Sequence, residues 1–122
     1  MADGRAALGL LGEELAADYL KSVGMRIVGR RVRVRRGELD IVARDGVEWV
    51  FIEVKTRSSG VMGDAASAVT MKKARSMTKA VREYLHDHDL EDAPVRCDLV
   101  TIDFTPDGAR RLEHHPASIP MA

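Results

Sequence analysis

The chain contains a single cysteine, Cys97, among its 122 residues. One cysteine excludes an internal disulfide, so we expect a reducing, cytoplasmic setting. No stretch approaches the ~20 uninterrupted apolar residues of a membrane helix, so we expect no membrane partner. The start of the chain also lacks the apolar run and small-residue cleavage site of a signal peptide.

The formal net charge is zero, because 19 basic and 19 acidic side chains cancel. A zero total argues mildly against a nucleic-acid partner, but the charges are unevenly distributed. Arginines crowd residues 26–36, lysines and arginines recur over 55–82, and acids gather over 83–92. A phosphate backbone meets one face of a protein, so this distribution keeps nucleic-acid binding open. A solvated basic surface without a ligand explains the charges equally well.

The composition is that of a globular protein, and the length suits one domain with a single core, about residues 4–104. Hydrophobic periodicity and turn signals predict two helices and five strands. They are a helix at 4–23, a strand at Arg26–Val34, a hairpin of 38–44 and 47–55, a helix at 70–86, and strands at Val95–Phe104 and 109–115. The tail, 116–122, is expected to fray.

Both predicted helices carry an apolar stripe. In the first, Leu8, Leu11, Leu15, Tyr19 and Val23 recur at steps of three and four, which predicts that they face the core. In the second, the corresponding positions are Ala74, Met77, Val81 and Leu85.

One charged side chain lies at the edge of each stripe. Glu13 is placed to reach over the sheet that the first helix covers, and Lys73 is the lysine of the second helix best placed to look toward the sheet. A surface glutamate and a snorkelling lysine are equally good explanations of these two residues.

Residues 37–57 are the most informative stretch. The dipeptide Asp45-Gly46 favours a two-residue hairpin turn, because a type I′ turn requires positive φ at both central positions. With that turn, Asp40 pairs with Phe51 and lies diagonal to Glu53. Diagonal neighbours are within ~7–8 Å, a gap that a metal ion can bridge between two carboxylates.

Alternation along the two strands places Glu38, Asp40, Glu53 and Lys55 on one face of the predicted sheet. A carboxylate in a run as apolar as residues 49–54 is costly unless it is paired or bound to a cation. A simple Glu53–Lys55 ion pair is the alternative, although one lysine would leave Asp40 uncompensated.

These motifs resemble those of the restriction-endonuclease-like nucleases, the PD-(D/E)xK superfamily, which includes archaeal Holliday junction resolvases. The chain resembles the YraN family of predicted endonucleases more closely. The matching segments are Gly12-Glu13, GELDIV at 37–42, FIEVKTR at 51–57, Ala68-Val69-Thr70 with Lys73, and Arg96 with Asp98-Leu99-Val100. Leu39 stands where the superfamily name has Pro, and Arg31 where YraN-like sequences usually have Asn.

The resemblance implies an α/β, restriction-endonuclease-like fold: a central mixed β-sheet flanked by helices, in the order αβββαβ(β). It also implies a Mg²⁺- or Mn²⁺-dependent endonuclease that hydrolyses phosphodiester bonds of DNA, with DNA favoured over RNA. The resolvase branch extends the expected substrate to branched or structured DNA. Resolvase-type chemistry needs two sites and hence a homodimer.

Site residues also follow from the resemblance. The implied catalytic residues are Glu13, Asp40, Glu53, Lys55 and Lys73. The implied metal ligands are Asp40, Glu53 and the carbonyl of Val54. The implied nucleic-acid-binding residues are Arg35, Arg36, Arg57, Lys72 and Lys73.

Two other functions remain open from the sequence. The chain could be a non-catalytic nucleic-acid-binding module that retains the nuclease fold. It could also be a protein-interaction domain whose basic faces only keep it soluble.

Overall fold

The computed structural model describes residues 4–58 and 69–121. The elements are α1 (Gly4–Ser22), β1 (Arg26–Val34), β2 (Gly37–Asp45), β3 (Glu48–Arg57), α2 (Met71–Asp87), β4 (Val95–Phe104) and β5 (Arg110–His115). This order confirms the predicted αβββαβ(β) arrangement, including the additional last strand.

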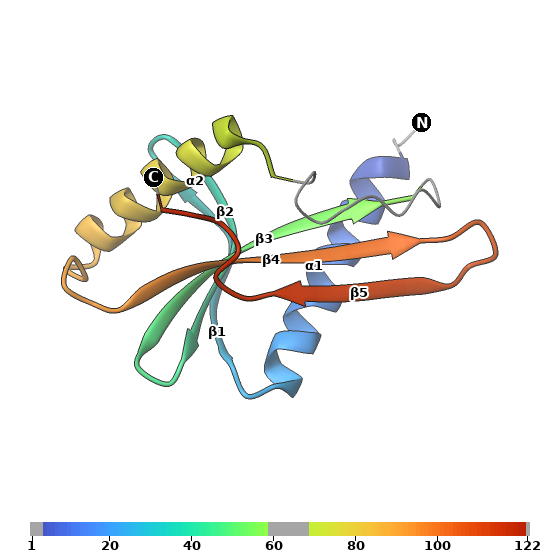
Figure 1. The fold of residues 1–122 in the computed structure, drawn as a ribbon, viewed down its shortest axis with the longest axis horizontal. Helices are drawn as coiled ribbons and strands as arrows, with labels where there is room; N and C mark the ends of the chain where they lie inside the picture. The colour runs from blue at the N-terminus through green and yellow to red at the C-terminus, as the bar shows by residue number, and fades with distance from the viewer. Residues whose placement is uncertain (1–3, 59–68, 122) are drawn as a thin grey trace.

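The five strands form one mixed sheet in the order β1-β2-β3-β4-β5 (Figure 1). Every neighbouring pair is antiparallel except β3 and β4, which are parallel. A parallel pair needs a long connection, and α2 is the helix in that connection. The predicted mixed sheet flanked by helices is therefore confirmed.

Two separate cores lie on opposite faces of the sheet. The core on the α2 side joins the buried face of that helix to Val42, Phe51 and Leu99. The core on the α1 side joins Ala16, Ala17 and Leu20 to the other face of the strands. Strand β3 supplies both cores and is buried on both faces, as the apolar run predicted.

The buried face of α1 differs from the predicted stripe. Leu11 and Val23 are 39% and 52% exposed, whereas Ala16, Ala17 and Leu20 are buried. The helix lies so close to β3 that small side chains, rather than leucines, occupy the contact. The predicted stripe is therefore wrong in orientation, although the helix itself is confirmed.

Gly12 marks the closest approach of α1 to the sheet. A Cβ at Gly12 would collide with Oγ1 of Thr56, a stiff β-branched side chain on β3. We expect Gly12→Ala to lower the free energy of unfolding by about 1–3 kcal/mol through overpacking. Gly9→Ala is the matched control: nothing lies within 4 Å of its added Cβ, so it should stabilise by about 0.5–1 kcal/mol. Urea unfolding measures both, and equal effects would contradict the close approach.

The hairpin turn consists of Gly46 and Val47 rather than Asp45 and Gly46. Asp45 pairs with Glu48, and Gly46 takes the positive φ of 63°. The predicted register is thus wrong by two residues. A shift of two keeps every side chain on its predicted face, because side chains alternate with period two.

The C-terminal tail packs against the sheet instead of fraying. Ile119 is only 3% exposed, and its N–H donates to the Cys97 carbonyl over 3.2 Å. The N–H of Ala117 donates to Oδ1 of Asp98 over 2.8 Å. The predicted fraying is wrong for residues 116–121, because the tail carries apolar side chains that complete the core on the α2 side.

Asp98 is the centre of a buried polar network that the sequence analysis missed. Its side chain is fully buried and accepts from Arg96 Nε at 3.0 Å and from His114 Nε2 at 2.8 Å. The other ring nitrogen of His114 lies 3.3 Å from the Tyr19 hydroxyl. The network therefore ties α1 to β4, β5 and the tail.

No helix in the described part of the chain is long and apolar enough to cross a membrane.

Candidate functional site

The site forms where β2 and β3 separate. Their pairing runs from the turn to Ile41 and Ile52, and the next residues along the two strands are Asp40 and Glu53. Oδ2 of Asp40 accepts the Val54 N–H over 2.9 Å. A side-chain oxygen thus replaces the backbone acceptor that the ladder would otherwise supply, and it fixes the Asp40 carboxylate at the fork.

A cavity of about 240 Å³ opens at this fork. Its carboxylates, Glu38, Asp40 and Glu53, come from the strands. Lys73 and Ser76 reach it from α2, and Arg36 from the turn between β1 and β2. Ser76 was not predicted, because no sequence pattern distinguishes it from other exposed helical serines.

Lys73 is held against Glu53. Its Nζ lies 3.3 Å from Oε1 of Glu53. The first turn of α2 fixes this lysine, because its backbone N–H donates to the Oγ1 of Thr70, the N-cap residue, over 3.1 Å. The prediction that Lys73 looks toward the sheet is confirmed by this contact.

The carboxylates of Asp40 and Glu53 lie in the same cavity, where their negative charges repel each other. Burial, followed by the charge of Asp40, raises the pKa of Glu53 from 4.5 to about 7. Burial also raises the pKa of Asp40, although the hydrogen bond from Val54 opposes that shift. The Lys73 ammonium compensates part of the charge. Without another cation the pair therefore tends to hold a proton near neutral pH.

Glu13 approaches the fork from α1. Its charge contributes to the raised pKa of Asp40, which places the two carboxylates within electrostatic reach. Oε1 of Glu13 is 2.9 Å from Nε of Arg31 on β1. The structure thus brings Glu13 to the predicted cluster and gives it an arginine partner.

Lys55 lies apart from the cavity. It is exposed, and alternation places it on the sheet face that carries Glu53. The cavity is lined by Lys73 and not by Lys55. Val54 is half-buried beside the fork, and its carbonyl faces the same side as its N–H, because both groups of one strand residue point to the same neighbour.

The predicted nucleic-acid-binding residues divide into two groups. Arg36 lines the cavity, Arg35 lies in the adjacent turn, and Lys72 is exposed on the first turn of α2. Arg57 instead forms an ion pair with Asp103, with Nε and Oδ1 2.6 Å apart and a second hydrogen bond of 3.1 Å. The structure thus gives Arg57 a role in joining β3 to β4.

The donor set of the cavity suits a hard divalent cation. No group of three His, Cys, Asp or Glu side chains in residues 4–58 and 69–121 is arranged to hold a metal ion. The fork nevertheless offers two half-buried carboxylates and the Val54 carbonyl, which points to the same neighbouring strand as the Val54 N–H bound to Asp40. Mg²⁺ favours such oxygen ligands and retains several waters, so it does not require a complete protein cage. The residues therefore fit the expected ion.

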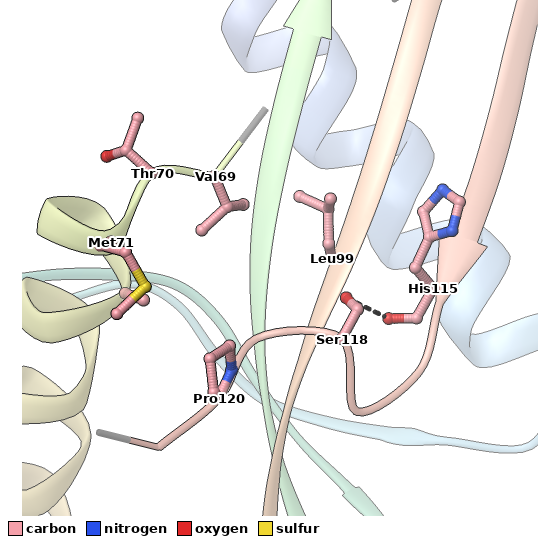
Figure 2. Close-up of a pocket in the computed structure, with 8 residues that line it drawn as sticks. Val69, Thr70, Met71, Leu99, His115, Ser118 and Pro120 are labelled. Atoms are coloured by element: carbon pink, nitrogen blue, oxygen red, sulfur yellow. Dashed lines mark hydrogen bonds between the residues drawn. The ribbon is translucent and has the colours of Figure 1, made fainter. Parts of the chain in front are cut away.

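A second cavity, of about 340 Å³, lies between the start of α2, β4 and the tail (Figure 2). Its wall is largely apolar, with His115 at one side, and includes Val69, Met71, Leu99 and Pro120. It contains no carboxylate, so the paired acids at the fork form the better candidate for chemistry.

The fold and the fork together define the class: an α/β protein whose mixed sheet carries two carboxylates where adjacent strands diverge, with a lysine of the covering helix beside them. The family described as uncharacterised protein family UPF0102 matches residues 12–102. The chain belongs to this family.

Several relatives are similar over most of the chain. A UPF0102 protein of Anaeromyxobacter dehalogenans is 43% identical over 95% of this chain and 86% of its own length. One of Mycolicibacterium vanbaalenii is 45% identical over 82% of this chain and 83% of its own. Among solved structures, Pyrococcus furiosus SfsA in complex with Ca²⁺ has a TM-score of 0.46 at 14% identity, over 97% of this chain and 65% of that chain.

Proposed function

We propose that the protein is a Mg²⁺- or Mn²⁺-dependent endonuclease that hydrolyses phosphodiester bonds of DNA. One observation carries the proposal: two half-buried carboxylates, Asp40 and Glu53, meet at a strand fork with a lysine 3.3 Å from one of them. Burial, together with the charge of a neighbouring carboxylate, raises the pKa of both groups, so their ionised forms are disfavoured in the ligand-free site. A divalent cation would supply that charge.

Asp40, Glu53 and the Val54 carbonyl would hold the ion. When bound, such an ion polarises the scissile phosphate and lowers the pKa of the attacking water. The Val54 N–H keeps one oxygen of Asp40 in place, so only the other oxygen needs to face a ligand. Preorganisation of this kind reduces the cost of assembling the site.

The lysines would bind and orient the substrate. Lys73 compensates Glu53 in the ligand-free protein, and its partly exposed ammonium is available to a phosphate once a cation takes over that task. Lys55, on the Glu53 face of β3, would stabilise charge that develops on the phosphate. Glu13 would assist from α1 as a further acceptor beside Asp40.

The backbone of DNA would lie over the rim of the cavity. Arg36 lines the cavity, Arg35 lies in the adjacent turn, and exposed Lys72 at the start of α2 would extend the contact with the backbone. These exposed cations are suited to phosphates rather than bases, so we expect binding with little sequence preference. Cleavage of both strands of a branched duplex would require two copies of the chain, and we include a homodimer in the proposal.

Calorimetric titration of Mn²⁺ into wild-type protein and Asp40→Asn tests the metal site. We expect binding by the wild type and its loss in the variant, because the amide removes the charge but retains an oxygen for the Val54 N–H. Equal binding by both proteins would refute the metal site. Lys55→Ala should bind Mn²⁺ like the wild type and fail to cut linear, flapped and four-way DNA.

A DNA-binding module without turnover is the second candidate. The Lys73–Glu53 ion pair favours it, because that contact stabilises Glu53 without any metal. This alternative predicts DNA binding that survives Glu53→Ala and Lys55→Ala, together with no metal-dependent cleavage by the wild type.

A further inference from the structure

Arg31 has an unusual backbone for a residue within a strand. Its φ is 50°, in the left-handed region that long side chains rarely adopt. The flanking pairs are Arg30 with Ile41 and Val32 with Leu39, so Arg31 lies opposite Asp40 of the candidate site. Backbone strain of this kind persists where the surrounding structure enforces it, and it often occurs at functional positions.

The Arg31 side chain extends from β1 to Glu13 on α1. It is 51% exposed, and its Nε donates to Oε1 of Glu13 over 2.9 Å. The terminal Nη1 and Nη2 groups make no hydrogen bond to any described residue. A guanidinium has five N–H donors in a fixed fork, so most of the donors of Arg31 remain available to a ligand.

Arg31 is also the cation on the β1 side of the carboxylate cluster. Its guanidinium interacts electrostatically with Glu38 and Asp40 as well as with Glu13. Lys73 provides the cation on the α2 side, 3.3 Å from Glu53. The guanidinium of Arg31, on β1, and the ammonium of Lys73, on α2, thus flank the carboxylates.

We propose that Arg31 binds a phosphate of the DNA backbone beside the scissile phosphate, which would lie at the ion proposed for Asp40 and Glu53. This inference rests on the proposed function, because it places the same DNA on the same cavity. In the ligand-free protein the Glu13 carboxylate occupies the place of an oxyanion against the guanidinium. An incoming phosphate accepts from the free Nη groups, in the paired geometry that distinguishes arginine from lysine.

Arg31→Gly is the informative variant. Glycine adopts positive φ without steric cost, so this variant should fold at least as well as the wild type while lacking the guanidinium. Arg26→Ala is the matched control, because it removes one exposed arginine from the opposite end of the same strand. Arg31→Lys retains the charge and loses the fork.

Fluorescence anisotropy with a short labelled DNA duplex in EDTA measures the effect without cleavage. We expect Arg31→Gly to bind about tenfold more weakly, the loss of one charge-assisted hydrogen-bonded contact. The slope of log K against log salt should fall by about one. The DNA affinity of Arg31→Lys should lie between those of the wild type and Arg31→Gly, and Arg26→Ala should bind like the wild type.

Glu13→Gln separates phosphate binding from a purely structural role. If Arg31 serves only to hold Glu13, Glu13→Gln and Arg31→Gly should weaken binding equally, and that result would overturn the inference. We expect Glu13→Gln to bind DNA at least as tightly as the wild type, because it frees the guanidinium. Wild-type affinity and salt slope in Arg31→Gly would also overturn it.

Failure of the inference is distinguishable from failure of the proposed function. Mn²⁺ titration and cleavage test the metal chemistry, whereas the anisotropy measurement contains no divalent ion. A protein that binds DNA through Arg31 and never cuts would refute the endonuclease and support the phosphate contact.

Discussion

Glu53→Gln should stabilise the metal-free protein at neutral pH. The folded protein holds a proton on Glu53 up to about pH 7, whereas the ordinary pKa is 4.5. Between these values the folded state binds more protons than the unfolded state, so wild-type stability falls as pH rises and then levels off. The difference corresponds to about 3 kcal/mol at ~1.36 kcal/mol per pKa unit. Glutamine carries no charge and removes this loss.

Urea unfolding of both proteins across this pH range measures the effect. The advantage of Glu53→Gln should be smallest near pH 4.5, the ordinary pKa, and should grow toward neutral pH. Glu38→Gln is the control, because Glu38 lines the same cavity but is more exposed. Mn²⁺ should restore the stability that the wild type loses as the pH rises toward neutral, since a cation can replace the proton. An advantage that does not change with pH would contradict the shared charge at the fork.

Asp98→Ala should cause the largest loss of stability in the chain. The fully buried carboxylate accepts from Arg96, His114 and the Ala117 N–H. Its removal leaves Arg96 with Glu48 and Asp45 alone, and it takes the acceptor from the nearly buried His114 ring and from the Ala117 N–H. Breaking a buried charged network in this way costs about 3–5 kcal/mol. The reason is desolvation: the donors that faced the Asp98 carboxylate lose their acceptor where water cannot replace it.

Thermal and urea unfolding test this prediction. Asp98→Asn should be intermediate, because its amide oxygen can still accept from one donor. Asp92→Ala, in the exposed acidic stretch before β4, is the matched control and should change stability little. An Asp98→Ala protein as stable as this control would show that the network contributes nothing to the fold.

The strands were predictable because their signals are local. Alternation, the apolar run of β3 and a glycine-containing turn fixed the elements and the faces of Asp40 and Glu53. The turn was predicted at Asp45-Gly46 and lies one residue later, at Gly46-Val47. Both choices place a glycine at a central position of the turn, so the sequence did not distinguish them. The error left the site intact because a shift of two preserves alternation.

The helix faces were less predictable. Periodicity identified α1, but it favoured the leucines as core residues, whereas the structure buries Ala16, Ala17 and Leu20. Only the close approach at Gly12 explains why small side chains face the sheet. That approach depends on the path of β3 in space, which no local pattern contains.

Partners across the sheet were not predictable at all. Sequence places Arg31 and Arg57 among the basic residues, and nothing in their neighbourhood indicates Glu13 or Asp103 as their acceptors. The resemblance supplied Glu13 as a site residue but gave no hint of its arginine. These pairs arise from the order of strands in the sheet, so they appear only once the chain is folded.

The hydrogen bond from the Val54 N–H gives the two oxygens of the Asp40 carboxylate different roles. Oδ2 completes the junction of β2 and β3, and the other oxygen is left for a ligand. The position of that second oxygen is consequently set by the backbone of two strands and not by a side-chain rotamer. A mutation that weakened this hydrogen bond would therefore displace a ligand of Asp40 as well. Selection for a precise site and selection for the correct separation of β2 and β3 would both act on the contact between the Val54 N–H and Oδ2 of Asp40.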